Sequence, residues 1–328
     1  IAMTADNAAN ALYISRYQQF FAADALAGLH IGIYEHSSAG RDVYRSLFES
    51  LGATVTSLER SDVFVPIDTE AVSAEDQAKA HAWAAKYHFD AIFSTDGDGD
   101  RPLVSDEHGT WLRGDIVGLL SAKLLGINAL AVPVSCNSAI ELAGCFAKVQ
   151  RTRIGSPYVI DAFAALAASY PSVAGFEANG GFLLASRLSN AHGQLAALPT
   201  RDALLPALTV LAHSKGQGVA ALLANLPARF TVSDRLQHVP TAWSKAWLDS
   251  FNQDAARFLA PFGYGTQDVH SVNQTDGLRL TLISGDVLHF RPSGNAPELR
   301  CYVEAATVEG ASSLLAQTLQ KMQQLASQ

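Results

Sequence analysis

The sequence is poor in cysteine and in basic residues. Three cysteines occur in 328 residues, Cys136, Cys145 and Cys301, and they show no metal-binding spacing. Such an odd, scattered set argues against a disulfide scaffold and indicates a reducing compartment, so we expect a cytoplasmic protein with these thiols as small buried residues. Lysine and arginine number 23 against 31 acidic residues, a formal net charge of −8. No basic stripe is left to replace counterions, which excludes nucleic acid as the expected partner.

The sequence also lacks an apolar run that is long enough to cross a bilayer. Its longest apolar region, residues 116–134, is interrupted by Lys123, Asn128 and Pro133, which indicates a helix followed by a strand. The first four residues lack the charged, apolar and small-residue order of a secretory signal. We therefore expect no membrane partner. A beginning at Ile1, without an initiator Met, predicts a fragment of a longer protein.

Hydrophobic residues make up 48% of the sequence, enough to bury sizeable cores, and the length exceeds what one core usually organises. Up to about residue 226, helical periodicity alternates with short buried strands, which predicts an α/β fold with two similar domains of mixed or parallel sheets. After Pro227, strands joined by short turns predict a C-terminal α+β domain with an antiparallel sheet. We therefore expect three domains, residues 1–113, 114–226 and 227–328.

Periodicity and end signals place the individual elements. The expected helices are residues 11–27, 41–51, 74–88, 116–125, 139–146, 158–168, 203–213, 242–259 and 308–325, with a further helical stretch to Leu223. The expected strands are residues 30–35, 54–58, 90–93, 129–134, 149–152, 173–176, 269–273, 278–282, 287–291 and 299–303. Ligands of parallel sheets gather beyond the carboxyl ends of the strands, which is where the residues after Phe93 fall.

Three carboxylates stand at alternate positions in Ser94-Thr-Asp-Gly-Asp-Gly-Asp-Arg101, whose residues 96–101 we call the acidic loop. Acidic groups so close repel one another unless a cation lies among them. The intervening glycines let the backbone curl, so that the side chains of Asp96, Asp98 and Asp100 converge. Oxygen-only ligands suit Mg²⁺, Mn²⁺ or Ca²⁺ and not zinc. A metal beside Arg101 is typical of a site that handles phosphate.

Two other interpretations of the acidic loop stay open. Gly and Asp are ordinary turn residues, so the segment is alternatively a solvated turn. An EF-hand that counts Asp96 as its first position would have Glu107 as its twelfth. Its sixth position, which needs Gly, is however Arg101, and a strand-like run precedes the loop where a helix should stand.

Two later loops carry polar side chains. The segment Arg291-Pro-Ser-Gly-Asn-Ala-Pro-Glu-Leu-Arg300, the arginine loop, puts two guanidiniums, a hydroxyl and a flexible backbone around one turn, which suits a phosphate dianion. The alternative is a hairpin with solvated arginines. Residues 177–181, the Glu177 loop, offer the carboxylate of Glu177 and the amide of Asn179, as vicinal sugar hydroxyls require. In this order the three loops favour a sugar phosphate as ligand.

On these motifs the chain resembles the α-D-phosphohexomutase superfamily of phosphoglucomutases and phosphomannomutases, over nearly its whole length. Asp96-Gly-Asp-Gly-Asp-Arg101 is similar to the magnesium loop of that family, Phe176-Glu-Ala-Asn-Gly-Gly181 to its sugar loop, and Arg291-Pro-Ser-Gly-Asn-Ala-Pro297 to its phosphate loop. Thr152-Arg-Ile-Gly155 resembles the stretch before the sugar loop. The chain also departs from the family pattern: Asn179 replaces Ser, Gly181 replaces His, Asn295 replaces Thr, Ala296 replaces Glu, and Ser156-Pro157 replaces the polar or charged pair that commonly follows Gly155.

The resemblance implies a four-domain enzyme whose first domain carries a phosphorylated serine in a Thr-x-Ser-His-Asn-Pro segment. No such segment occurs in this sequence, so we expect the chain to correspond to domains two to four. The implied reaction is intramolecular phosphoryl transfer, an isomerisation between hexose 1-phosphate and hexose 6-phosphate of glucose or mannose, with a hexose 1,6-bisphosphate as intermediate or primer.

The resemblance also implies roles for individual residues. Mg²⁺ would bind Asp96, Asp98 and Asp100, and Arg101 would assist catalysis. The implied substrate-binding residues are Glu177, Asn179, Arg291, Ser293, Gly294, Asn295 and Arg300.

A serine of this chain is not expected to replace the missing nucleophile. Ser37 and Ser38 follow a strand, but His36 stands where a nucleophile elbow requires Gly, so we interpret both as helix-capping residues. His81 and His88 are expected at the surface. Two other functions stay open: a sugar-phosphate binding protein without turnover, and a metal-dependent sugar phosphatase in which water accepts the phosphoryl group. We expect a monomer or a homodimer.

Overall fold

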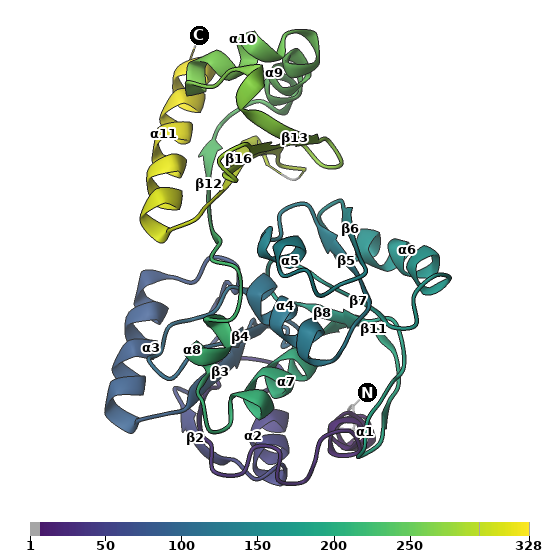
Figure 1. Cartoon of the computed structure of the whole chain (residues 1–328). Coiled ribbons are helices and arrows are strands. Elements are labelled where there is room, and N and C mark those ends of the chain that lie inside the picture. Colours follow the sequence, from purple (N-terminus) through teal and green to yellow (C-terminus); the bar gives the residue numbers. More distant parts are fainter. Residues whose placement is uncertain (1–6, 295, 328) are drawn as a thin grey trace, which may run out of the picture. The chain divides into compact units, whose positions relative to one another are not determined.

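In the computed structural model, which describes residues 7–294 and 296–327, the first elements are α1 (Asn7–Gln18), β1 (His30–Tyr34), α2 (Arg41–Ser50), β2 (Thr54–Leu58), α3 (Ala74–Tyr87), β3 (Ala91–Thr95) and β4 (Pro102–Val104). The strands form a sheet in the order β2-β1-β3-β4, with β4 antiparallel to β3 and the other pairs parallel (Figure 1). All five residues of β3 are buried, as expected for a central strand covered on both faces. The acidic loop begins at the carboxyl end of β3.

The next elements are α4 (Gly114–Leu124), β5 (Ala129–Pro133), α5 (Ala139–Leu142), β6 (Lys148–Thr152), α6 (Ser156–Ala167), β7 (Val173–Phe176), β8 (Phe182–Leu184), β9 (Leu188–Ser189), β10 (Gln194–Leu195), β11 (Leu198–Asp202), α7 (Leu204–Ser214) and α8 (Val219–Leu223). A mixed sheet has the order β11-β8-β7-β5-β6, and β9 and β10 form a separate pair. β7 is parallel to β5 and antiparallel to β8. The turn between β7 and β8 is the Glu177 loop.

The last elements are β12 (Phe230–Gln237), α9 (Thr241–Gln253), α10 (Ala255–Leu259), η1 (Ala260–Phe262), η2 (Thr266–Asp268), β13 (Val269–Asn273), β14 (Leu278–Leu282), β15 (Val287–Pro292), β16 (Glu298–Ala305) and α11 (Val308–Ala326). The sheet order is β12-β16-β15-β14-β13, and every neighbouring pair is antiparallel (Figure 1). Alternate residues of the strands, among them Leu280 and Phe290, form a core with Trp247 and Met322 of the helices. The arginine loop joins β15 to β16.

The predicted fold class, two mixed or parallel α/β sheets followed by an antiparallel sheet with helices, is confirmed. The predicted domain boundaries stay a prediction. By its internal contacts the chain forms two compact units, the first of Ile1–Pro133, Ala143–Gln150 and Gly155–Leu226, the second of Val134–Leu142, Arg151–Ile154 and Pro227–Gln328. Within the described ranges, no helix combines the length and the hydropathy of a membrane span.

Three predicted helices were wrong in extent. The helix expected at 242–259 is two helices, because Asp254 leaves helical geometry at φ −152° and caps α10 by accepting the Arg257 N–H at 2.9 Å. The first helix ends at Gln18, and the residues that follow form turns which bury Phe20 and Leu26. α5 ends early because Gly144, two residues beyond it, adopts the left-handed φ of +62° that stops helices.

Candidate functional site

The Asp96 carboxylate organises the acidic loop. The side chain is 6% exposed, and its Oδ1 accepts the backbone N–H groups of Gly99, Asp100 and Arg101 at 3.0, 3.2 and 3.3 Å. Gly99 supplies the positive φ of +79° that this tight turn needs. Asp96 Oδ2 lies 3.7 Å from Nε of Arg101. One carboxylate oxygen is therefore occupied in folding the loop, and the other faces a guanidinium.

The Asp100 carboxylate, in the acidic loop, pairs with an arginine of strand β11. Its Oδ2 lies 2.9 Å from Nε of Arg201 on β11, while its buried Oδ1 has no hydrogen-bond partner among the described residues. Burial raises the pKa of Asp100, and the nearby Arg201 guanidinium opposes this rise. An orphaned, buried carboxylate oxygen is the kind of donor that a hard cation such as Mg²⁺ takes.

The three predicted metal ligands are not gathered in this structure. Asp98 is exposed, and within residues 7–294 and 296–327 no group of three or more His, Cys, Asp or Glu side chains is close enough to hold a metal ion. The donor chemistry of Asp96, Asp98 and Asp100 fits a hard divalent cation, but their arrangement does not assemble a site. A magnesium ion at the acidic loop therefore stays a prediction.

Glu177 is a buried carboxylate at the carboxyl end of β7. It is 6% exposed, and its buried Oε2 finds no hydrogen-bond partner in the described part of the chain. Burial raises the pKa of Glu177, and the guanidiniums of Arg201 and Arg101 act in the opposite direction. The loop closes through the Gly180 N–H, which donates to the Glu177 carbonyl at 2.9 Å. Such an uncompensated acceptor is suited to bind the hydroxyls of a ligand.

The Glu177 loop is tightly held by its neighbours. Its Asn179 carbonyl accepts the hydroxyl of Thr69 at 2.8 Å. A Cβ on Gly114, the first residue of α4, would lie 2.1 Å from the Gly180 nitrogen, so position 114 must be glycine. The side-chain oxygen of Asn179 accepts the Gly181 N–H at 3.1 Å. An amide oxygen has two lone pairs, so Asn179 offers a ligand its amide N–H groups and the second lone pair of this oxygen.

Arg201 is the site residue that the sequence did not reveal. It stands on a strand that was not predicted, yet its guanidinium pairs with Asp100 and acts on the pKa of Glu177. One signal was available in the sequence, because Arg201 and Asp202 are two adjacent charges in the otherwise uncharged stretch from Leu198 to Leu205. Arg201 thus joins the acidic loop to the Glu177 loop within the first unit.

The arginine loop lies beside a cavity of about 580 Å³ in the second unit. Arg291, Ser293 and Gly294 line it, and the positive side chains of Arg153 and Lys245 line it as well. Nε of Arg291 lies 2.9 Å from Oδ1 of Asp276. These cations and the adjacent backbone offer the donors that a phosphate group needs.

Asp276 connects the arginine loop with the stretch that resembles the family's pre-sugar segment. While its Oδ1 holds Arg291, its Oδ2 accepts the Ile154 N–H at 3.0 Å. Arg300 stands opposite Arg291 on β16, and its Nη2 lies 4.0 Å from Oε2 of Glu298. The predicted phosphate ligands Arg291, Ser293 and Gly294 thus share a cavity, which Arg300 does not line. Asn295 lies outside the described residues.

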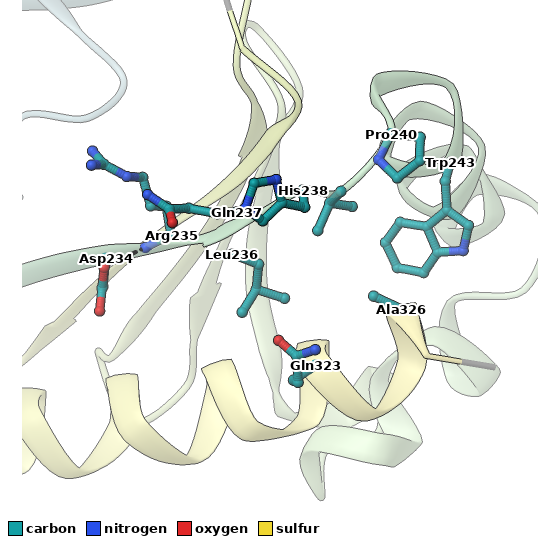
Figure 2. A pocket seen from close by; sticks show the side chains of 10 residues that line it. Asp234, Arg235, Leu236, Gln237, His238, Pro240, Trp243, Gln323 and Ala326 are labelled. Atoms are coloured by element: carbon teal, nitrogen blue, oxygen red, sulfur yellow. Dashed lines mark hydrogen bonds between the residues drawn. The ribbon is translucent and has the colours of Figure 1, made fainter.

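A second cavity of the same unit, of about 850 Å³, runs along β12. Figure 2 shows His238 between Arg235 on one side and Pro240 and Trp243 on the other, with Gln323 and Ala326 of α11 below them. None of the described residues predicted for the site lines this cavity. It therefore plays no part in the candidate site.

Two family models match the chain. Residues 113–230 match "Phosphoglucomutase/phosphomannomutase, alpha/beta/alpha domain III", and residues 219–321 match the C-terminal domain of the same family. A phosphomannomutase of Salmonella muenchen is 54% identical over 303 residues, 92% of this chain and 63% of that protein. A phosphomannomutase of Sinorhizobium fredii is 45% identical over 318 residues, 94% of this chain and 65% of that protein. The chain thus spans somewhat less than two thirds of the length of these relatives.

Solved structures share the fold. A putative phosphomannomutase of Thermus thermophilus superposes with a TM-score of 0.71 at 18% identity, covering 98% of this chain and 67% of that chain. An N-acetylphosphoglucosamine mutase of Aspergillus fumigatus, solved in complex with glucose 1,6-bisphosphate, gives 0.59 at 16% identity, covering 97% and 64%. At these identities the structural likeness shows the fold alone. With the matches of both family models and the two phosphomannomutases, it places the chain in the phosphoglucomutase/phosphomannomutase family, the α-D-phosphohexomutase superfamily.

Proposed function

We propose that the protein to which this chain belongs is an isomerase that interconverts hexose 1-phosphate and hexose 6-phosphate by phosphoryl transfer. The observation that carries this proposal is the clustering of Asp100 with the guanidiniums of Arg101 and Arg201, whose charges also act on the buried Glu177. A carboxylate that can accept sugar hydroxyls then stands beside cations that can hold a phosphoryl group. The two phosphomannomutase relatives support mannose phosphate as substrate, with glucose phosphate as the other candidate.

The chain's own residues would bind and position the substrate. Glu177 would accept a hydrogen bond from a ring hydroxyl, and the amide of Asn179 would donate one. The phosphate that is not reacting would be held by Arg291, Ser293 and Gly294, with Asn295 and Arg300 proposed beside them. Binding energy gained at this distant phosphate fixes the reacting end in place.

The reaction moves two phosphoryl groups, one onto the sugar and one off its other end. A phosphoserine gives its phosphoryl group to the free hydroxyl of the hexose monophosphate, which becomes a 1,6-bisphosphate, and the serine then takes back the phosphoryl group from the other end. We assign this serine to a segment outside the 328 residues, since no Thr-x-Ser-His-Asn-Pro segment occurs in them. Mg²⁺ at Asp96, Asp98 and Asp100 would neutralise phosphoryl oxygens during transfer. Arg101 would stabilise the same charge.

A bisphosphate primer and a cytoplasmic location complete the proposal. The neighbour solved with glucose 1,6-bisphosphate supports a bisphosphate as intermediate or primer. All three cysteines are free thiols, which supports a reducing compartment; Cys136 and Cys301 are buried as expected, whereas the same expectation for Cys145 was wrong, because it is exposed. Monomer or homodimer remains our prediction for the oligomeric state.

The test is an isomerase assay on the full-length protein. Mannose 1-phosphate, glucose 1-phosphate and glucosamine 1-phosphate are each supplied with Mg²⁺ and glucose 1,6-bisphosphate, and the 6-phosphate is followed through a coupling dehydrogenase or by ³¹P NMR. We expect turnover of at least the mannose or glucose ester. Conversion of none of them would overturn the proposal. Release of inorganic phosphate without isomer would favour the phosphatase alternative, which the mutase names of the relatives do not favour.

A further inference from the structure

The backbone of Gly181 does not require glycine. Gly180 has a positive φ of +92°, where side chains are strained, but Gly181 is not among the glycines with positive φ. The space around it is nevertheless closed, because a Cβ at position 181 would lie 2.8 Å from Cγ and 2.9 Å from Cδ of Arg201. The stem of Arg201 occupies the place that a side chain at position 181 would take. Glycine at 181 and arginine at 201 are therefore a matched pair.

The Arg201 guanidinium is used only in part by the protein. Its Nε lies 2.9 Å from Asp100, and the side chain is 28% exposed. Neither terminal nitrogen of Arg201 hydrogen-bonds to a residue in the described ranges, and neither is among the buried unsatisfied atoms. A guanidinium carries five N–H donors in a rigid fork, so the outer donors remain for a ligand.

Arg201 is also held firmly in place. The next residue, Asp202, is buried and accepts the hydroxyls of Tyr13 at 2.7 Å and Tyr17 at 2.6 Å. The same carboxylate accepts the Leu204 N–H at 3.0 Å, which fixes the start of α7. The backbone that carries Arg201 is thus tied to two helices, and its stem is confined against Gly181. Such preorganisation lets a side chain bind a ligand at a low entropic cost.

A phosphate could approach the carboxylates around Arg201 only beside cations. The acidic loop and Glu177 together carry four carboxylates, and Arg101 is the other cation that acts on the pKa of Glu177. A phosphate dianion that approached these carboxylates with Arg101 alone would meet repulsion. A second forked cation with free donors relieves that repulsion and matches the geometry of phosphate oxygens.

We propose that Arg201 is a substrate-binding residue, which donates from its terminal nitrogens to the phosphoryl group beside the acidic loop, and that Gly181 is glycine so that Arg201 can reach that place. This inference rests on the proposed function. It assigns a second arginine, together with Arg101, to the phosphoryl group that reacts. If Arg201 were only the ion-pair partner of Asp100, it would need its Nε alone. Replacing its terminal nitrogens would then leave ligand affinity unchanged.

The test measures binding of glucose 1,6-bisphosphate and mannose 6-phosphate to the 328-residue chain by calorimetry. Arg201→Ala is expected to weaken bisphosphate binding about 10- to 100-fold, the ratio that charge-assisted hydrogen bonds supply. Arg201→Lys keeps a charge that can pair with Asp100 but loses the fork, so affinity should still fall several-fold. Arg187→Ala, which removes an exposed arginine of the same unit, is the matched control and should bind like the wild type.

The glycine supplies an independent arm of the same test. Gly181→Ala should displace the Arg201 stem and weaken binding, whereas the same change added to Arg201→Ala should have no further effect, because the two side chains no longer compete. Circular dichroism and melting curves establish that the variants are folded, and Arg201→Lys serves if the alanine variant is not. Wild-type affinity in Arg201→Lys and in Gly181→Ala would overturn the inference while leaving the proposed function intact. A wild-type chain that binds neither ligand would overturn the inference, and the isomerase assay on the full-length protein would then decide the proposed function.

Discussion

Glu304 holds a buried charge cluster in the second unit, and its replacement gives a quantitative test of the structure. It is 3% exposed, and its carboxylate accepts the Ser138 N–H at 2.9 Å and the Ser138 hydroxyl at 2.6 Å. Nη2 of Arg279 lies 3.3 Å from it, and Nε of Arg229 lies 3.8 Å from it, with side chains 12% and 8% exposed. Glu304→Gln would replace one carboxylate oxygen by an NH₂ group, which faces the N–H and O–H donors of these partners. It would also remove the negative charge that balances the two buried arginines.

The expected loss in the free energy of unfolding is about 3–5 kcal/mol, as for a buried ion pair from which one partner is removed. Urea denaturation followed by tryptophan fluorescence measures it, since Trp243 and Trp247 of α9 report on the second unit. Glu309→Gln, at an exposed position in the first turn of α11, is the control and should cost at most about 1 kcal/mol. A loss below about 1 kcal/mol for Glu304→Gln would refute the reasoning, because two buried cations that lose their carboxylate partner should destabilise the fold by more than that.

Three further predictions concern the loops. Arg291→Ala should weaken glucose 6-phosphate binding about tenfold or more in calorimetry, whereas Arg257→Ala, an exposed arginine on α10, should not; equal affinities would contradict the arginine loop as a phosphate site. Glu177→Gln should raise the melting temperature at neutral pH, because the pKa of the buried Glu177 is raised in the folded state. Below the ordinary pKa of about 4.3, Glu177 is protonated in both the folded and the unfolded state and does not destabilise the fold; as the pH rises through the raised pKa, the buried group ionises and stability is lost. The difference in melting temperature between Glu177→Gln and the wild type should therefore vanish below about pH 4. A gain that is independent of pH would count against this explanation. Asp98→Asn should weaken Mn²⁺ binding in an EPR titration without lowering the melting temperature, since Asp98 is exposed. Asp96→Ala should lower the melting temperature, because it removes three hydrogen bonds to backbone N–H groups. Unchanged Mn²⁺ affinity in Asp98→Asn would argue against a metal at this loop.

The sequence predicted those elements best whose own residues decide their conformation. The strands expected at 54–58, 173–176, 269–273 and 278–282 are confirmed at the same residues. Their apolar residues lie between glycines, prolines or polar turns, which local rules recognise. The short strands β4, β8 and β11 and the edge strand β12 were not predicted. β4 and β8 are three residues each, and their conformation depends on pairing with β3 and β7 rather than on a period of their own.

The candidate site was predicted in the same uneven way. The acidic loop lies beyond the carboxyl end of β3, as its pattern predicted, but the pattern could not reveal that Asp96 Oδ1 is occupied by backbone N–H groups. Nor could it show that the amide oxygen of Asn179 closes its own loop. Motif spacing gives the type of each side chain, whereas its free hydrogen-bonding capacity depends on how the loop folds.

Contacts between distant stretches account for what the motifs missed. Arg201 follows the acidic loop by 100 residues and reaches Asp100 because β11 is the edge strand beside β8, in the sheet that carries the Glu177 loop. Its position depends in turn on Asp202, which the tyrosines of α1 hold from nearly 190 residues away along the chain. In the sequence this arrangement shows only as a glycine at position 181. The backbone of Gly181 does not need glycine, so the closeness of the Arg201 side chain is the reason for it. The pairing of Gly181 with Arg201 is therefore a property of the fold, and a comparison of the loops with a family pattern would record only Gly181, as an isolated departure.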